Sequence, residues 1–180
     1  MIDKKNLYYK KVKNPTPEFI PCEGVMTLPF CLKLMQKTEN FTEGFSFDIA
    51  SAYLRASGKR KRKPPVLRRR AIGALLKAMC FYYDPVSNTV IRSITELAID
   101  CGLAERTANG HVAINRAVRA IKSLEADYEF ITCLASSDVT KKQYVHCTIS
   151  FTPRLFEYLG VFPLALAEAR LACGAGGSSE

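Results

Sequence analysis

The chain has few of the side chains from which metal centres are built. Among its 180 residues are only two histidines, His111 and His146, and its seven cysteines lie at wide spacings with no C-x-x-C pair. A structural zinc site needs paired ligands at short spacing, so this pattern argues against one. The odd number of cysteines indicates free thiols that serve as small apolar side chains in a reducing cytosol.

Long apolar runs and nucleotide-binding loops are also missing. No window approaches the ~18 consecutive apolar residues of a membrane span, and the start, "MIDKKNLYYKK", lacks the apolar segment of a secretory signal. The sequence contains no P-loop, no G-x-G-x-x-G and no cluster of carboxylates. Neither histidine has a plausible Ser or Cys partner. We therefore expect a cytoplasmic protein without a membrane contact, a cofactor, a metal or a catalytic site.

Acidic residues are absent from "GKRKRKPPVLRRR", residues 58 to 70, which holds eight of the 26 Lys and Arg. The formal net charge is +9, and without these eight it would be 9 − 8 = +1. The positive character is therefore concentrated in one stretch, which we call the basic strip (residues 59–70). Such concentration is typical of proteins that bind nucleic acid or an anionic membrane surface, and of these two partners we expect nucleic acid.

The composition, with 48% apolar and 24% charged residues, is that of a globular chain. We expect an extended, proline-rich arm over residues 1–24, one domain over residues 25–172 that includes the basic strip, and a flexible Gly/Ser tail over residues 173–180. The first helices are expected over residues 27–37 and 45–57. Pro64-Pro65 should end any helix upstream and allow a new one to begin at Pro65. The apolar stripe expected to be buried on this new helix includes Ile72, Leu75, Leu76 and Met79.

The middle of the chain predicts a helix-turn-helix followed by a hairpin. Residues 89–94 are expected to form a short strand, and Ser93 with Glu96 forms a capping box at the start of a helix that ends near Gly102. A second helix is expected over residues 107–126. The turn that joins it to the first helix is expected to be longer than in a usual helix-turn-helix. Strands over residues 128–135 and 144–152 follow, and then two short helices. This order predicts a winged helix with extra terminal helices, in an α+β fold that is mainly α.

The second helix is expected to read the DNA sequence, because the segment from Arg106 to Leu124 contains basic residues and no acidic residue. Arg and Asn suit bidentate contacts to guanine and adenine. The residues expected to read bases are Arg106, Asn109, Arg116 and Arg119. The residues expected to hold the DNA backbone are Lys59, Arg60, Lys61, Arg62, Lys63, Arg68, Arg69, Arg70, Lys141 and Lys142.

Each of these features has an ordinary alternative. The polar side of the second helix would also suit a solvated amphipathic helix. Residues 59–63 would suit a solvated linker or a targeting signal. Lys141 and Lys142 would suit the tip of any exposed loop.

Several segments resemble the RepA replication initiators of the IncFII plasmid group: "YYKKVKNPTPEF", "FCLKLMQK", "PPVLRRRAIGALLKAMCFYYDP" and "SITELAIDCGLA". The resemblance runs from about Tyr8 to about Ala167. It implies winged-helix domains, binding to double-stranded DNA at a plasmid origin, remodelling of that origin, and host replication proteins as partners. Members of the family continue past this length with a basic C-terminal half, so the resemblance also implies a shortened form.

The function expected from residues and resemblance together is sequence-specific DNA binding that initiates plasmid replication at its origin. A winged-helix transcriptional repressor shares every physical feature described above and is separated from this function only by the resemblance. A dimerisation or interaction module of a larger initiator, with a homodimer as its product, is the third possibility.

Overall fold

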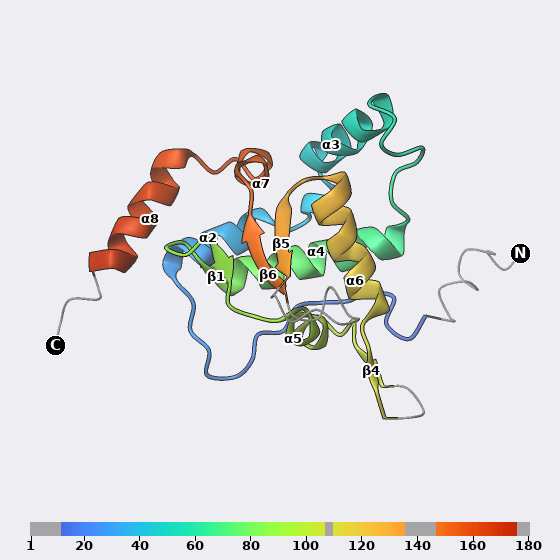
Figure 1. Cartoon of the computed structure of the whole chain (residues 1–180), viewed down its shortest axis with the longest axis horizontal. Helices are drawn as coiled ribbons and strands as arrows, with labels where there is room; N and C mark the ends of the chain where they lie inside the picture. The colour runs from blue at the N-terminus through green and yellow to red at the C-terminus, as the bar shows by residue number, and fades with distance from the viewer. Residues whose placement is uncertain (1–11, 107–109, 136–146, 176–180) are drawn as a thin grey trace, which may run out of the picture.

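In the computed structural model, which describes residues 12–106, 110–135 and 147–175, the chain is an α+β protein, about half helical, with a small antiparallel sheet (Figure 1). Within these ranges no helix combines the length and apolar character that crossing a bilayer requires. The helices are α2 (Pro29–Lys37), η1 (Phe41–Glu43), α3 (Phe45–Ala56), α4 (Val66–Phe81), α5 (Ile94–Asp100), α6 (Asn115–Lys122), the π-helical turn η2 (Ser123–Asp127), α7 (Pro153–Tyr158) and α8 (Pro163–Ala175). The strands are β1 (Tyr83–Asp84), β2 (Thr89–Val90), β3 (Glu105–Arg106), β4 (Val112–Ala113), β5 (Ile131–Ala135) and β6 (Cys147–Phe151).

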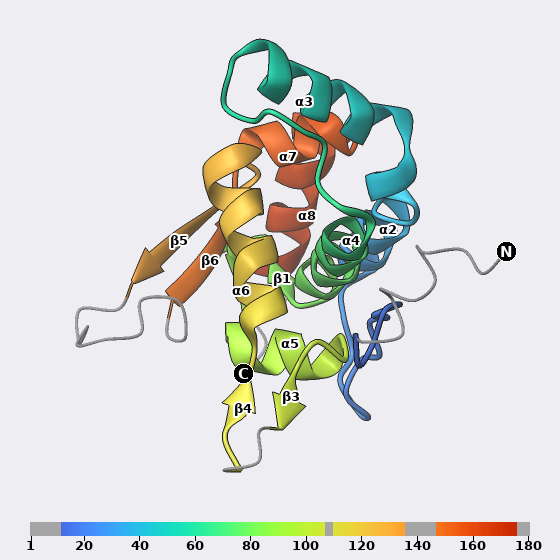
Figure 2. The same cartoon turned by 90° about the vertical axis from the view of Figure 1, so that its right-hand side faces the viewer.

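Helix α4 lies at the centre of the fold and contacts α2, α5 and α6 (Figure 2). Pro64 and Pro65 precede it, and Pro65 is its N-cap, one residue before the first helical position. The predicted apolar stripe of this helix is confirmed, because Ile72, Leu75 and Met79 are completely buried. Burial of this kind provides most of the helix's stability, since propensity alone contributes little.

The main sheet has the strand order β1-β2-β6-β5, with every neighbouring pair antiparallel. The predicted hairpin is confirmed in its strands, which pair with Ile131 opposite Phe151. Alternate residues of β6 face the core, and the Phe151 ring stacks on Tyr83 with centroids 4.6 Å apart. The predicted strand over residues 89–94 is shorter, because only β2 pairs with a neighbour.

The local signals around α5 are confirmed. The Ser93 side chain accepts the backbone N–H of Glu96, and the Glu96 carboxylate accepts the backbone N–H of Ser93. This capping box satisfies two backbone donors that have no partner inside the helix. Gly102 has φ +63°, in the left-handed region where a helix commonly ends, and a Cβ there would lie only 2.7 Å from Nδ2 of Asn14.

The predicted helix over residues 107–126 is confirmed only from Asn115 onward, as α6 and η2, and its earlier part is wrong. Its first part is a second, two-stranded hairpin, in which Arg106 of β3 pairs with Val112 of β4, and α6 begins only at Asn115. The sequence signal against a continuous helix is the pair Asn109-Gly110, a dipeptide typical of turns and loops. Gly110 has φ +77°, which no helix contains. The connection between α5 and α6 is therefore longer than usual, as predicted.

Residues 12–28, which include most of the predicted arm, contain no helix or strand and lie over α4 and α5. Phe19 is buried against the rings of Phe81 and Tyr82, with centroids 5.3 and 5.8 Å away. The backbone N–H of Ile20 donates to the carbonyl of Asp100 at 2.9 Å. This segment is therefore part of the packed structure.

Candidate nucleic-acid interface

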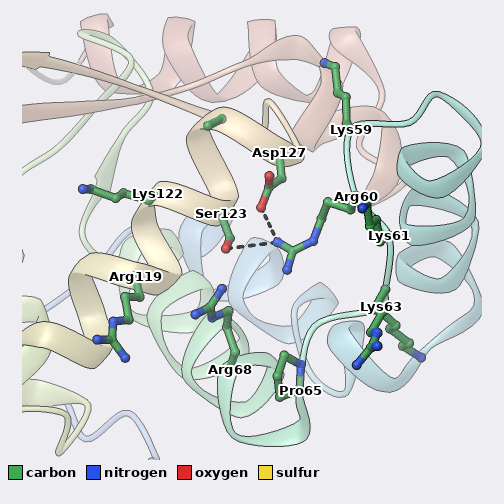
Figure 3. Close-up of a pocket in the computed structure, with 12 residues that line it drawn as sticks. Lys59, Arg60, Lys61, Lys63, Pro65, Arg68, Arg119, Lys122, Ser123 and Asp127 are labelled. Atoms are coloured by element: carbon green, nitrogen blue, oxygen red, sulfur yellow. Dashed lines mark hydrogen bonds and ion pairs between the residues drawn. The ribbon is translucent and has the colours of Figure 1, made fainter.

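Basic side chains from three segments surround one hollow in the surface, with a volume of about 740 Å³ (Figure 3). We call this hollow the basic groove. It is lined by Lys59, Arg60, Lys61, Arg62, Lys63, Pro65, Arg68, Arg119, Lys122, Ser123, Ala126 and Asp127. Residues 59–63 form one wall, the start of α4 contributes Arg68, and α6 with η2 forms the other wall. Eight of the twelve lining residues are cations and one is an acid, so the groove is suited to a polyanion.

Three acids hold the wall formed by residues 59–63. Lys59 pairs with Glu129, Arg60 with Asp127, and Lys63 with Asp48. The backbone N–H of Arg60 also donates to the carbonyl of Leu54 at 3.0 Å. These contacts anchor a segment that has no helix or strand of its own.

Four cations of the groove have no acidic partner among the described residues. Two lie in the segment 59–63, one lies on α4 and one on α6. Lys61, Arg62 and Arg119 are exposed, and Arg68 is half-buried. None of these four side chains makes an ion pair or a side-chain hydrogen bond within the described ranges. They are free to meet an anion without first losing a carboxylate partner, whereas Lys59, Arg60 and Lys63 would have to exchange one.

Two residues of α4 that were predicted to contact the DNA backbone lie outside the groove. Arg69 is half-buried and pairs with Glu43 at 3.2 Å, and its Nε has no partner among the described residues. Arg70 is exposed and donates from Nη1 to the carbonyl of Pro15 at 3.2 Å. Lys141 and Lys142, predicted to hold the backbone, and Asn109, predicted to read bases, fall outside the described residues.

The predicted reading residues do not share one helical face. Arg106 lies in β3, whereas Arg116 and Arg119 lie on α6. Arg116 is half-buried: its Nη1 donates to the carbonyl of Asn14, and its Nη2 has no partner within the described ranges. Burial lowers the pKa of the Arg116 guanidinium. The N-terminal segment therefore covers Arg116, which the sequence predicted to be accessible.

The exposed face of α6 consists instead of Asn115, Arg119 and Lys122, at spacings i, i+4 and i+7. Asn115 and Lys122 were not among the predicted site residues. The signal that identifies them is the helical period itself, because Asn115, Arg119 and Lys122 lie opposite the buried Ala117, Ala120 and Ile121. Asn115 and Arg119 are the two types suited to bidentate contacts with bases.

The model of the IncFII RepA protein family matches residues 7–172 of the chain. The chain belongs to this family. Every residue of the basic groove lies inside the matched range, as do α5, α6 and the β5-β6 hairpin. The resemblance seen in the sequence is thereby confirmed.

Among curated relatives of this IncFII RepA chain is the "Replication initiation protein" of Escherichia coli, 49% identical over 170 residues, which cover 94% of this chain and 59% of that protein. The "Probable replication-associated protein repA1" of Buchnera aphidicola subsp. Acyrthosiphon pisum is 26% identical over 165 residues, covering 88% of this chain and 58% of that protein. The chain thus spans about three fifths of the length of these relatives. No solved structure matches it significantly.

One carboxylate in the groove of this RepA-family chain provides a test of its electrostatics. Replacing Asp127 by Asn should tighten binding to any DNA duplex, because Arg60 would lose its carboxylate partner and become available to a phosphate. The slope of log K against log salt should steepen by up to roughly 0.9, the value for one added phosphate contact. Fluorescence anisotropy with a labelled duplex at several salt concentrations would measure both quantities.

The matched control for this test is Glu39→Gln, which removes an acid that pairs with Lys77 outside the groove. This change should leave the salt slope unaltered, because neither partner lines the groove. Equal effects of Asp127→Asn and Glu39→Gln would mean that only the net charge of the protein matters, and that the groove has no special part in binding.

Proposed function

We propose that this chain binds double-stranded DNA at a plasmid origin through the basic groove and acts there in the initiation of replication. The observation that carries the proposal is the convergence of eight cations from residues 59–63, α4 and α6 on one hollow with a single acid. Phosphate contacts supply most of the affinity of such a surface and make it sensitive to salt. Membership of the IncFII RepA family supports the origin as the target.

The proposal includes a winged-helix arrangement. Helix α5, the longer connection through β3 and β4, helix α6 and the β5-β6 hairpin follow one another in the order of that motif. In this arrangement α6 is the reading helix, and Asn115 and Arg119 contact base edges. The loop between β5 and β6 is the wing, and Lys141 and Lys142 hold the backbone beside it. Arg116 is omitted from the reading set because the segment around Asn14 covers it.

Footprinting on the origin region of the parent plasmid tests the proposal directly. The purified chain should protect a defined site within the origin fragment and none within a promoter fragment of equal length. Protection confined to the promoter would instead favour a transcriptional repressor. Binding to both fragments with equal affinity and no defined footprint would limit the chain to sequence-independent DNA binding.

Arg119→Ala separates base reading from backbone contact. If Arg119 contacts a guanine with both of its donor groups, its loss should weaken binding to the origin site by about 1–3 kcal/mol and binding to unrelated DNA far less. Lys61→Ala is the matched variant, and it should weaken both by about the same factor because Lys61 meets only phosphate. Competition titrations with origin and unrelated duplexes give the four affinities. If Arg119→Ala also weakens both equally, α6 is not a reading helix.

A further inference from the structure

Helix α3 has two apolar sides, and only one of them is needed for the fold. Phe47, Ala50 and Leu54 face the core and are at most 2% exposed. On the outer side Phe45, Ile49 and Tyr53 are 80%, 47% and 55% exposed. Isolated exposed apolar residues are ordinary on protein surfaces, but these three lie at i, i+4 and i+8 and therefore follow one another along a single helical stripe. We call them the α3 stripe.

The α3 stripe has the composition of a binding surface. Ala52 and Ala56 are also exposed and lie on the same side of the helix, so the apolar surface is continuous over three turns. Aromatic side chains contribute large contact areas at low entropic cost and are enriched in the residues that dominate binding energies. No described residue outside α3 buries the stripe, although the guanidinium of Arg154 on α7 lies 5.4 Å from the centre of the Tyr53 ring.

The charges around the α3 stripe are mainly positive. The cations beside it are Arg55, Lys59, Lys63 and Arg154, and the acids paired with them are Asp48 and Glu129. Four cations and two acids leave a net charge of 4 − 2 = +2 on the rim. A second copy of this chain would bring the same positive rim to the contact, which opposes self-association through this face. An apolar partner surface with an acidic border is complementary to it.

We propose that the α3 stripe is a docking surface for an amphipathic helix of another protein, with large apolar side chains on one face and Asp or Glu along its borders. The stripe provides the apolar contact and the rim cations select the acidic helix. Such a partner would be bound by the same chain that binds DNA. This docking role goes beyond the DNA-binding function proposed above and does not depend on it. Phe45, Ile49 and Tyr53 do not line the basic groove, whereas the rim cations Lys59 and Lys63 do.

Two designed helical peptides provide the test. Both carry Leu at i, i+3, i+4 and i+7, and they differ only in having Glu or Lys along the borders of the apolar face. The Glu peptide should bind the full chain saturably in anisotropy titrations, and the Lys peptide at least about tenfold more weakly. Ile49→Ala and Arg55→Glu should each weaken the Glu peptide by about tenfold, the first through lost apolar contact and the second through reversed charge.

Folding and DNA binding of the same variants are measured alongside. Both substitutions are on the outer side of α3, so the thermal midpoint and the affinity for duplex DNA should stay close to those of the unchanged protein; a loss of peptide binding then concerns the α3 stripe alone. The proposal is overturned if Ile49→Ala leaves the peptide affinity unchanged, or if both peptides bind equally. It is also overturned if light scattering shows self-association that Ile49→Ala abolishes, or if anionic vesicles bind the stripe and the Glu peptide does not.

Discussion

Replacing Lys61, Arg62 and Arg68 together by Ala should weaken binding to duplex DNA by about 10²–10³-fold near 0.1 M salt. Each lost phosphate contact lowers the slope of log K against log salt by roughly 0.9, so three contacts lower it by about 2.7 and cost about 2.7 decades of affinity between 1 M and 0.1 M salt. Lys61 and Arg62 are exposed, Arg68 is half-buried, and none of the three is paired within the described ranges. Their removal should therefore leave the fold intact, and titrations at several salt concentrations would measure the change.

The control compares single substitutions that remove the same charge. Lys33 is exposed on α2, away from the groove. Lys33→Ala should leave the salt slope within error of the unchanged protein, whereas Lys61→Ala should lower it by roughly 0.9. An unchanged slope in the triple variant would mean that residues 59–63 form a linker, and the proposed DNA interface would have to lie elsewhere in the chain.

Phe19→Ala should destabilise the protein by about 3–5 kcal/mol, the usual cost of removing a buried aromatic ring. Phe19 is 6% exposed and packs on Phe81 and Tyr82. Domains of this kind are stable by only about 5–15 kcal/mol, so the change should be large enough to unfold part of the population under mild conditions. Urea denaturation followed by circular dichroism measures the free energy of unfolding.

The neighbouring residue supplies the comparison. Ile20 is 71% exposed, and its backbone N–H donates to the carbonyl of Asp100 in α5. Ile20→Ala keeps that hydrogen bond and should change the free energy of unfolding by less than about 0.5 kcal/mol. If Phe19→Ala and Ile20→Ala had the same small effect, the N-terminal segment would not belong to the folded unit. The cover over Arg116 would then be a weak and easily opened contact.

The parts of the fold that could be predicted from the sequence depend on neighbours a few residues apart. The capping box needs only Ser93 and Glu96, and the end of α5 needs only a residue that tolerates positive φ, Gly102. The apolar stripe of α4 could likewise be predicted from the helical spacing of its apolar residues. The predicted start of the second helix was wrong for an equally local reason, since the turn dipeptide Asn109-Gly110 interrupts a segment whose apolar residues have helical spacing.

The candidate site could be predicted only in part, because its geometry depends on residues far apart in the sequence. The charge of residues 59–63 was visible, but the pairing of Arg60 with Asp127, 67 residues away, was not. The cover over Arg116 comes from Asn14, 102 residues earlier in the chain. No periodicity or spacing encodes such contacts, since they arise only when the core brings the segments together.

The π-helical turn Ser123–Asp127 has a consequence for how the family can vary in length at this point. In this turn the N–H of Tyr128 donates to the carbonyl of Ser123, five residues back instead of four, so the turn accommodates one residue more than an α-helix would. A relative with a single-residue deletion here would regain a regular helix. Four α-helical steps of about 100° each give nearly the same rotation as the five smaller steps of the π-turn, so Asp127 would still point toward Arg60. Such a deletion would shorten the chain at the groove and leave the charge of the groove unchanged.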